Sequence, residues 1–140
     1  MIGAIILALF VNVRVPFEVA AAACVGADPA IASVALKGVH TDGGLNIYHF
    51  SGVVTNVGHA GQASNVLQFV GIYEDGIRRD VRSIPPLKAG ASFPFVYDYQ
   101  RSTDAGDGTT SLRFQLDTRK PVPPGGQDCN LGNDEAVVSF

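Results

Sequence analysis

The protein has 140 residues, a formal charge of −3, 46% hydrophobic residues and only 16% charged residues. This length suits one domain with a modest core, and the hydrophobic content argues against disorder. The weak acidity gives no reason to expect a nucleic-acid partner, because phosphate binding requires clustered lysine and arginine.

The chain begins with MIGAIILALFVNV, an apolar run of about a dozen residues that is too short to span a bilayer comfortably. The alanines that precede Cys24 are typical of the cleavage region of an export signal. No basic residue precedes the run, and Arg14 and Glu18 follow it, so an anchor, a buried first strand or a start site inside a longer signal are alternatives. We expect residues 1–23 to be a signal peptide or N-terminal apolar segment, and residues 24–140 to form one domain that is secreted, periplasmic or at the cell surface.

Short runs of strand type separated by turn residues follow from residue 30 onwards, with no amphipathic helical stretch after residue 24. The run that ends in Tyr73 is apolar on nearly both faces, as in a central strand. Pro94 cannot donate a sheet hydrogen bond, so its strand should lie at an edge or carry a bulge. The predicted strands lie within residues 30–39, 45–56, 65–76, 77–84, 91–99, 110–118 and 135–140.

Seven short strands with frequent turns predict an all-β protein, a seven-stranded antiparallel immunoglobulin-like sandwich with a short apolar segment at its N-terminus. In the strand over residues 77–84, Ile77 and Val81 are set on one side against Arg78, Asp80 and Arg82. The predicted core includes Val34, Leu36, Phe50, Val54, Phe69, Tyr73, Phe95, Leu112, Phe114 and Val138.

Five residues should define the turns. Asn56 and Gly58 end the second strand, where we expect their tolerance of left-handed φ to let the chain leave the sheet. Asp75 and Gly76 are typical of a tight primed hairpin turn. Gly90, in PPLKAG, should also adopt positive φ.

The ordered segments VTNVG, VLQFVGIYEDG, IPPLKAGASFPFVYDY and LRFQLDT resemble the bacterial cell-adhesion-related domain, CARDB, over about residues 28 to 140. Residues 55–58 match the "tNvG" motif of that family and residues 72–76 match "vyvdG". The matches continue in the turn after the fourth strand and at the end of the sixth, at Leu87, Gly90, Ser92 and Asp117.

The resemblance implies an immunoglobulin-like sandwich that serves as a non-catalytic binding or adhesion module of a bacterial or archaeal surface or periplasmic protein. Its partner would be a cell-surface protein or glycan, or copies of itself. The chain departs from the family near its C-terminus, where QDCNLGNDEAVV replaces an acidic, asparagine-rich stretch and contains Cys129. An alternative is a structural subunit of a surface filament that donates its N-terminal apolar segment as a strand. The membrane would be contacted only through that segment, if it is retained.

Two cysteines, Cys24 and Cys129, exclude both a disulfide-dense scaffold and a zinc site made of cysteines alone. If each strand crosses the sandwich once, the six strands between residue 30 and the loop after Asp117 return the chain to the pole where it started. We therefore predict a Cys24–Cys129 disulfide. A lipidated Cys24 is the alternative.

Catalytic, metal and cofactor sites are not expected. Nothing in the sequence places His40, His49 and His59 together, and STDAGDG lacks the register of a calcium loop. No nucleophile elbow or phosphate-binding loop is present.

A few side chains could contact a partner. Arg78, Arg79 and Arg82 could bind carboxylates, but we favour protection of a sheet edge as the role of these charges. His59 and Gln62 lie in the loop GHAGQAS, which we expect at a pole of the sandwich and which, with PPLKAG and RKPVPPGGQD, could form a contact surface.

Overall fold

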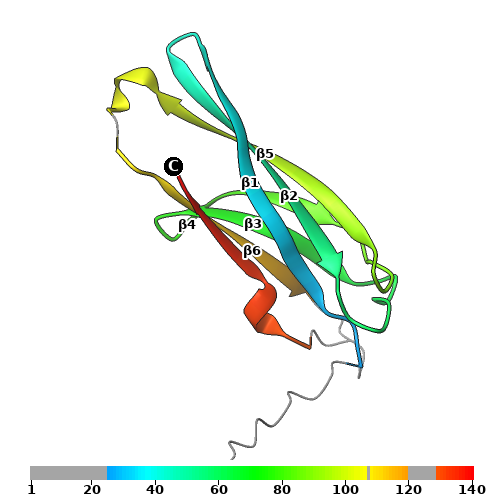
Figure 1. Ribbon diagram of the computed structural model, residues 1–140. Helices are drawn as coiled ribbons and strands as arrows, with labels where there is room; N and C mark the ends of the chain where they lie inside the picture. Colours follow the sequence, from blue (N-terminus) through cyan, green and yellow to red (C-terminus); the bar gives the residue numbers. More distant parts are fainter. Residues whose placement is uncertain (1–24, 107, 120–128) are drawn as a thin grey trace, which may run out of the picture.

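The structure is a computed structural model and describes residues 25–106, 108–119 and 129–140. Its elements are β1 (Pro29–Asp42), β2 (Leu45–Asn56), β3 (Leu67–Glu74), β4 (Ile77–Ile84), β5 (Ser92–Ser102), the 3₁₀ turn η1 (Thr103–Ala105), β6 (Ser111–Arg119), the 3₁₀ turn η2 (Leu131–Asn133) and β7 (Glu135–Ser139). Sheet A has the order β1-β2-β5 and sheet B the order β4-β3-β6-β7, with antiparallel pairing throughout. The two sheets form the layers of a sandwich (Figure 1), so the predicted seven-stranded fold is confirmed.

The core lies between the layers and is supplied by alternate residues of each strand. Phe50 and Phe114 come from opposite sheets, are almost fully buried, and their ring centroids lie 5.8 Å apart. Burial of each such side chain contributes roughly 1.5–3 kcal/mol to folding. Most of the predicted core is confirmed, with Val34, Leu36 and Val138 partly buried at its margin.

The prediction for β3 chose the wrong face. Phe69 and Tyr73 are only half-buried, whereas Val70 and Ile72 are completely buried between the sheets. Both sets of alternate positions are apolar, so alternation could not decide between them. Gln68 takes the third inward position, which is possible because its side chain hydrogen-bonds to Gln62 and to the Pro85 carbonyl.

β4 has a single buried residue. Ile77 and Val81 are 58% and 40% exposed, and Ile84 is the buried residue of this strand. Asp80 and Arg82 pair with the inward-facing Ile72 and Val70 of β3, so their side chains lie on the inward side of an edge strand. Inward-pointing charges on an edge strand discourage pairing with other sheets.

Two of the predicted turns are confirmed and one is explained differently. Asp75 and Gly76 have φ of 50° and 76°, as a primed hairpin turn requires, and Gly90 has φ of 75°. Asn56 and Gly58 do not adopt positive φ. A Cβ at residue 58 would lie 2.3 Å from the Gly26 carbonyl oxygen, so close backbone approach is what requires glycine there.

The β1–β2 hairpin is longer than predicted and projects beyond the sandwich (Figure 1). Gly43 and Gly44, with φ of 54° and 81°, form its turn. Pro94 lies on β5, which is an edge strand of sheet A, as its missing N–H predicted. Among the described residues, no helix is long and apolar enough to cross a membrane. Residues 1–23 lie outside the described residues.

Candidate functional site

The side chain of Asn56 is a buried hub at one pole of the sandwich. Its Oδ1 accepts from the N–H groups of Asp28 at 3.0 Å and Gly58 at 3.1 Å, and its Nδ2 donates to the carbonyl oxygens of Ala60 at 2.9 Å and Leu87 at 3.0 Å. One amide therefore ties the start of β1 to the loops after β2 and β4. These contacts give the matched "tNvG" motif a structural role, and we call this region the Asn56 pole.

Gln62 belongs to the same structural network. It exchanges two side-chain hydrogen bonds with Gln68, of 2.9 and 2.8 Å, and its Oε1 also accepts from the Leu87 N–H. Its backbone N–H donates to the Leu87 carbonyl oxygen at 2.9 Å. The side chain of Gln62 therefore holds the loop in place. His59, in the same loop, is exposed and is the more accessible of the two predicted contacts.

The three arginines of β4 do not act as one patch. Arg79 pairs with Glu74 at 3.0 Å, and Arg82 pairs with Asp80 at 2.7 Å. Arg82 also donates to the Val96 carbonyl oxygen of β5 at 2.8 Å and lies over the Tyr97 ring, so it bridges the two sheets. Arg78 is exposed and pairs with Tyr73, which places it on the outside of sheet B.

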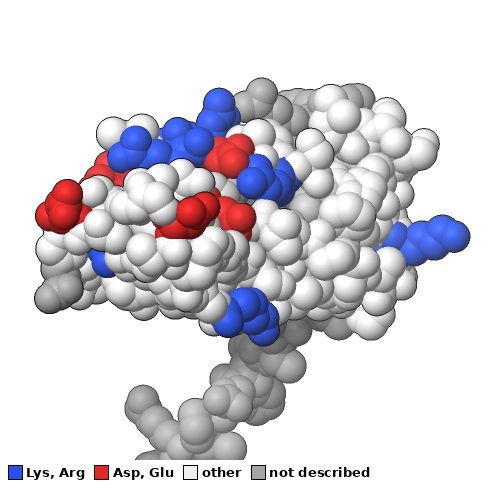
Figure 2. Space-filling view, turned by 90° about the horizontal axis from the view of Figure 1, so that it is seen from above, with Lys and Arg blue, Asp and Glu red and all other residues white. Residues whose placement is uncertain are grey.

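Charges of both signs are mixed around this bridge. Partial burial of Asp80 disfavours its charged form, but the Val81 N–H and the Arg82 guanidinium outweigh this and hold the pKa of Asp80 below its usual value. Figure 2 shows acidic and basic side chains gathered together at one side of the surface seen from above, with most of the rest neither acidic nor basic. Polyanions bind to surfaces of predominantly positive charge, and this surface mixes both signs.

Tyr99 and Arg101 extend the polar network along β5. The Tyr99 hydroxyl donates to Glu74 at 2.8 Å, and Arg101 donates to the Tyr48 hydroxyl at 2.6 Å. Burial, the hydrogen bond to Glu74 and its charge raise the pKa of Tyr99. Burial and the nearby charges of Asp80 and Glu74 raise the pKa of Tyr97. The bond from Tyr99 to Glu74 joins the two sheets, whereas Arg101 and Tyr48 both belong to sheet A.

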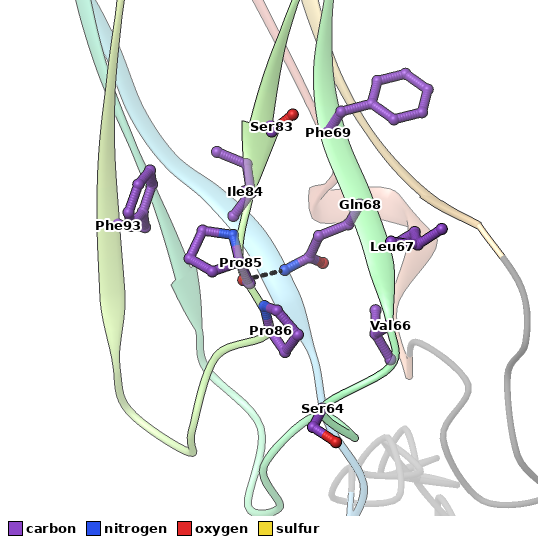
Figure 3. Close-up of a pocket in the computed structure, with 10 residues that line it drawn as sticks. All are labelled: Ser64, Val66, Leu67, Gln68, Phe69, Ser83, Ile84, Pro85, Pro86 and Phe93. Atoms are coloured by element: carbon purple, nitrogen blue, oxygen red, sulfur yellow. Dashed lines mark hydrogen bonds between the residues drawn. The ribbon is translucent and has the colours of Figure 1, made fainter.

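A groove of about 710 Å³ opens where β4 ends. It is lined by Ser64, Val66, Leu67, Gln68, Phe69, Ser83, Ile84, Pro85, Pro86 and Phe93. In Figure 3 Gln68 points toward Pro85, whereas Leu67 and Phe69 extend to the other side of β3. The groove therefore continues from the gap between the sheets onto the outside of sheet B.

The outer face of sheet B carries apolar side chains, those of Leu67, Phe69, Tyr73, Val81 and Val137, among polar ones that include Arg113, Gln115 and Asp117. Leu67 is 65% exposed and Val137 is 58% exposed. Tyr73 lies over Gly71, where a Cβ would come within 2.7 Å of its ring, and the Arg113 guanidinium stacks on the same ring at 4.5 Å. Several exposed apolar side chains on one sheet face make this face a candidate contact surface.

A second arrangement, which sequence reasoning missed, crosses the outer face of sheet A. The His40 Nδ1 lies 2.7 Å from the His49 Nε2, and the His49 Nδ1 lies 2.6 Å from an Asp98 oxygen. Sequence reasoning found nothing that places the histidines together, but the structure brings His40 and His49 into contact. His59 lies beyond the other end of β2.

Cys129 lies at the Asn56 pole, since its N–H donates to the Ala27 carbonyl oxygen at 3.3 Å. This contact places Cys129 beside the chain segment that leads back to residue 24. Cys24 itself lies outside the described residues, and the described residues contain no free cysteine. The disulfide stays a prediction, now supported by the proximity of the two chain segments.

The chain matches no protein-family model and no curated protein. It is similar to a solved structure, the CARDB domain of the PF1109 protein from Pyrococcus furiosus in complex with di-metal ions. The two share 14% sequence identity with a TM-score of 0.60, and the match covers 82% of this chain and 92% of that domain.

The protein has a CARDB-type fold. The turn motifs around Asn56 and Gly76 that suggested this fold are therefore confirmed as fold signals. They form the Asn56 pole and the hairpin turn at Gly76.

Proposed function

We propose that this chain is a non-catalytic, extracytoplasmic binding or adhesion module of a bacterial or archaeal surface or periplasmic protein. Its binding surface is the outer face of sheet B together with the adjoining groove. The sequence carries no nucleophile elbow or phosphate loop, so the proposed activity is recognition without turnover.

The observation that carries this proposal is a set of exposed aliphatic side chains on one sheet face. Leu67, Val81 and Val137 expose aliphatic side chains on the outside of sheet B, at 65%, 40% and 58%. Phe93, 36% exposed, continues this apolar surface at the groove. Aliphatic side chains favour a protein partner over a glycan, because sugars stack best on open aromatic rings and Tyr73 is covered by Arg113.

The alternative of a filament subunit requires a free strand edge that can accept a donated strand. On β5 the Val96 carbonyl oxygen already accepts from Arg82, and Pro94 removes a donor. On β4 charged side chains occupy inward positions, and β1 has two register shifts. These features protect three of the four edge strands, all but β7, and they support the binding module rather than strand exchange.

The metal ions of the PF1109 domain belong to that protein. Among the residues that the structure describes here, no group of three or more histidine, cysteine, aspartate or glutamate side chains could hold a metal ion.

The proposal is tested by biolayer interferometry of the immobilised full chain against solubilised surface proteins and, separately, against a glycan panel. Leu67→Ser and Val81→Lys should reduce binding to a protein at least tenfold. Val96→Lys is the matched control, because Val96 is 65% exposed but lies on the outer face of sheet A. Binding reduced only by Val96→Lys, or binding to glycans alone, would contradict the proposed surface or its partner class.

A further inference from the structure

The row His40–His49–Asp98 crosses all three strands of sheet A on its outer face. His40 comes from β1, His49 from β2 and Asp98 from β5, and Asp98 pairs directly with His49 in the sheet register. The His49 and Asp98 side chains are 38% and 56% exposed, so the row is open to solvent. No part of the surface proposed for partner binding includes it.

A β-bulge brings His40 to this row. The register shifts between Leu36 and Gly38, which puts Gly38 opposite His49 and His40 on the same side of the sheet. Without this extra residue, the alternation of the strand would turn His40 to the opposite side. A Cβ at Gly38 would meet nothing within 4 Å, so there is open space beside the His49 ring.

Asp98 determines how His49 presents its nitrogens. The 2.6 Å contact from His49 Nδ1 to the Asp98 carboxylate places the proton on Nδ1 in the neutral ring. The lone pair of His49 Nε2 is then directed away from Asp98, toward His40 Nδ1 at 2.7 Å. A carboxylate that orients the far nitrogen of a histidine is the usual support of a metal-ligating imidazole.

We propose that His40 Nδ1 and His49 Nε2 form a surface site for one divalent transition-metal ion, with Asp98 as the positioning residue of His49. In the metal-free form a single proton lies between the two nitrogens. When the ion binds, this proton leaves His40 Nδ1 and His40 takes one from water at Nε2, so that neutral His40 coordinates through Nδ1. A tetrahedral ion with metal–nitrogen bonds of about 2.0–2.1 Å requires the two nitrogens to be about 3.3 Å apart. The exposed His40 side chain can make that small movement, and water completes the coordination.

The chemistry of the donors selects the ion. Neutral imidazole prefers Zn²⁺, Ni²⁺ and Cu²⁺, whereas Ca²⁺ and Mg²⁺ require oxygen ligands. Among the three preferred ions, Cu²⁺ should bind most tightly. Because both imidazoles must be neutral to bind the ion, affinity should fall as the solution is acidified.

The test is calorimetric titration of the tag-free full chain, with any thiols alkylated, using ZnCl₂, NiCl₂ and CuCl₂ and, as negative controls, CaCl₂ and MgCl₂. We expect one Zn²⁺ or Cu²⁺ per chain in the wild type, and loss of that binding in His40→Gln and in His49→Gln. Asp98→Asn should weaken binding about 10–100-fold, the range for loss of such a supporting carboxylate. His59→Gln, in a loop elsewhere, should bind like the wild type.

Circular dichroism and thermal melting of each variant separate loss of the site from loss of the fold, and these exposed side chains should leave both unchanged. A wild-type chain that binds no transition-metal ion overturns the proposal. So does a His40→Gln variant that is folded and binds with unchanged affinity and stoichiometry.

Discussion

The Asn56 pole and the outer face of sheet B depart in opposite directions from the distribution seen in most folded proteins, where apolar side chains are buried and polar ones are exposed. At the pole, a polar side chain with no exposed surface sits where an apolar one is expected. On the outer face, Leu67 and Val137 expose apolar surface where polar groups are expected. Both are departures from simple patterning, but their consequences differ.

The two regions differ in whether the chain itself supplies partners for the unusual side chains. All four hydrogen bonds of the Asn56 amide are made within the chain, so the pole is complete in itself and its role is stability. Nothing within the described residues covers Leu67 or Val137. Their apolar surface is therefore removed from water only when another molecule binds there. Substitutions at the pole should therefore change stability, and substitutions on the face should change binding.

Asn56→Ala should give the largest loss of stability, about 3–5 kcal/mol, because it leaves two N–H groups and two carbonyl oxygens without their buried partner. Urea denaturation followed by circular dichroism measures this loss. Asn65→Ala, at an exposed loop residue, is the control and should change stability by less than about 0.5 kcal/mol. Equal effects of the two substitutions would show that the amide network does not hold the pole.

Cys129→Ser should lower the free energy of unfolding by about 2–4 kcal/mol if the disulfide to Cys24 forms, since the closed loop is long. Intact-mass measurement with and without reductant, followed by alkylation, detects the bond. Two alkylated thiols before reduction, or a diacylglyceryl mass on Cys24, would contradict it.

Gly58→Ala should cost about 1–3 kcal/mol, because the new Cβ would lie 2.3 Å from the Gly26 carbonyl oxygen and the backbone would have to move. Gly108→Ala is matched to it, since a Cβ at residue 108 would meet nothing within 4 Å. Thermal melting of the two variants should separate them clearly. If Gly58→Ala were as stable as Gly108→Ala, close approach of the backbone would not be the reason that the "tNvG" motif has glycine at residue 58.

Tyr97 and Tyr99 should make the protein sensitive to alkali. Burial, with neighbouring carboxylates, raises both pKa values, so the folded state retains protons that the unfolded state releases. The resulting stability is complete below pH about 10 and is lost as the pH rises through the raised values. The urea midpoint should fall between pH 8 and pH 10.5, and this fall should be smaller for Tyr97→Phe than for the wild type. Tyr99→Phe should also lose about 1 kcal/mol at pH 8 through its hydrogen bond to Glu74.

Leu67→Ser should have the smallest effect on stability, within about 0.5 kcal/mol, because its side chain is already 65% exposed. The same denaturation series measures it beside Asn56→Ala. A large loss of stability would mean that Leu67 is part of the fold, and the proposed contrast between the pole and the outer face would then fail.

Sequence alone determined the strands, their turns and the architecture. Strict alternation in β2 and β6 identified Phe50, Val54, Leu112 and Phe114 as core residues, because a half-buried strand repeats every two residues. Asp75 with Gly76 identified the hairpin, because few residues tolerate that backbone conformation. The ordered turn motifs were sufficient to indicate the CARDB-type fold.

Only the tertiary structure decided which face of β3 is buried, what Asn56 does and which histidines meet. Phe69 and Val70 are both apolar, so their sequence period carries no information about the side that packs. Two of the four Asn56 bonds join residues 28 and 31 positions apart along the chain, and His49 meets Asp98 across 49 positions. The pairing of His40 with His49 depends on a bulge that no turn residue announces. Local chemistry specifies local backbone, whereas such contacts exist only when the strands are in register.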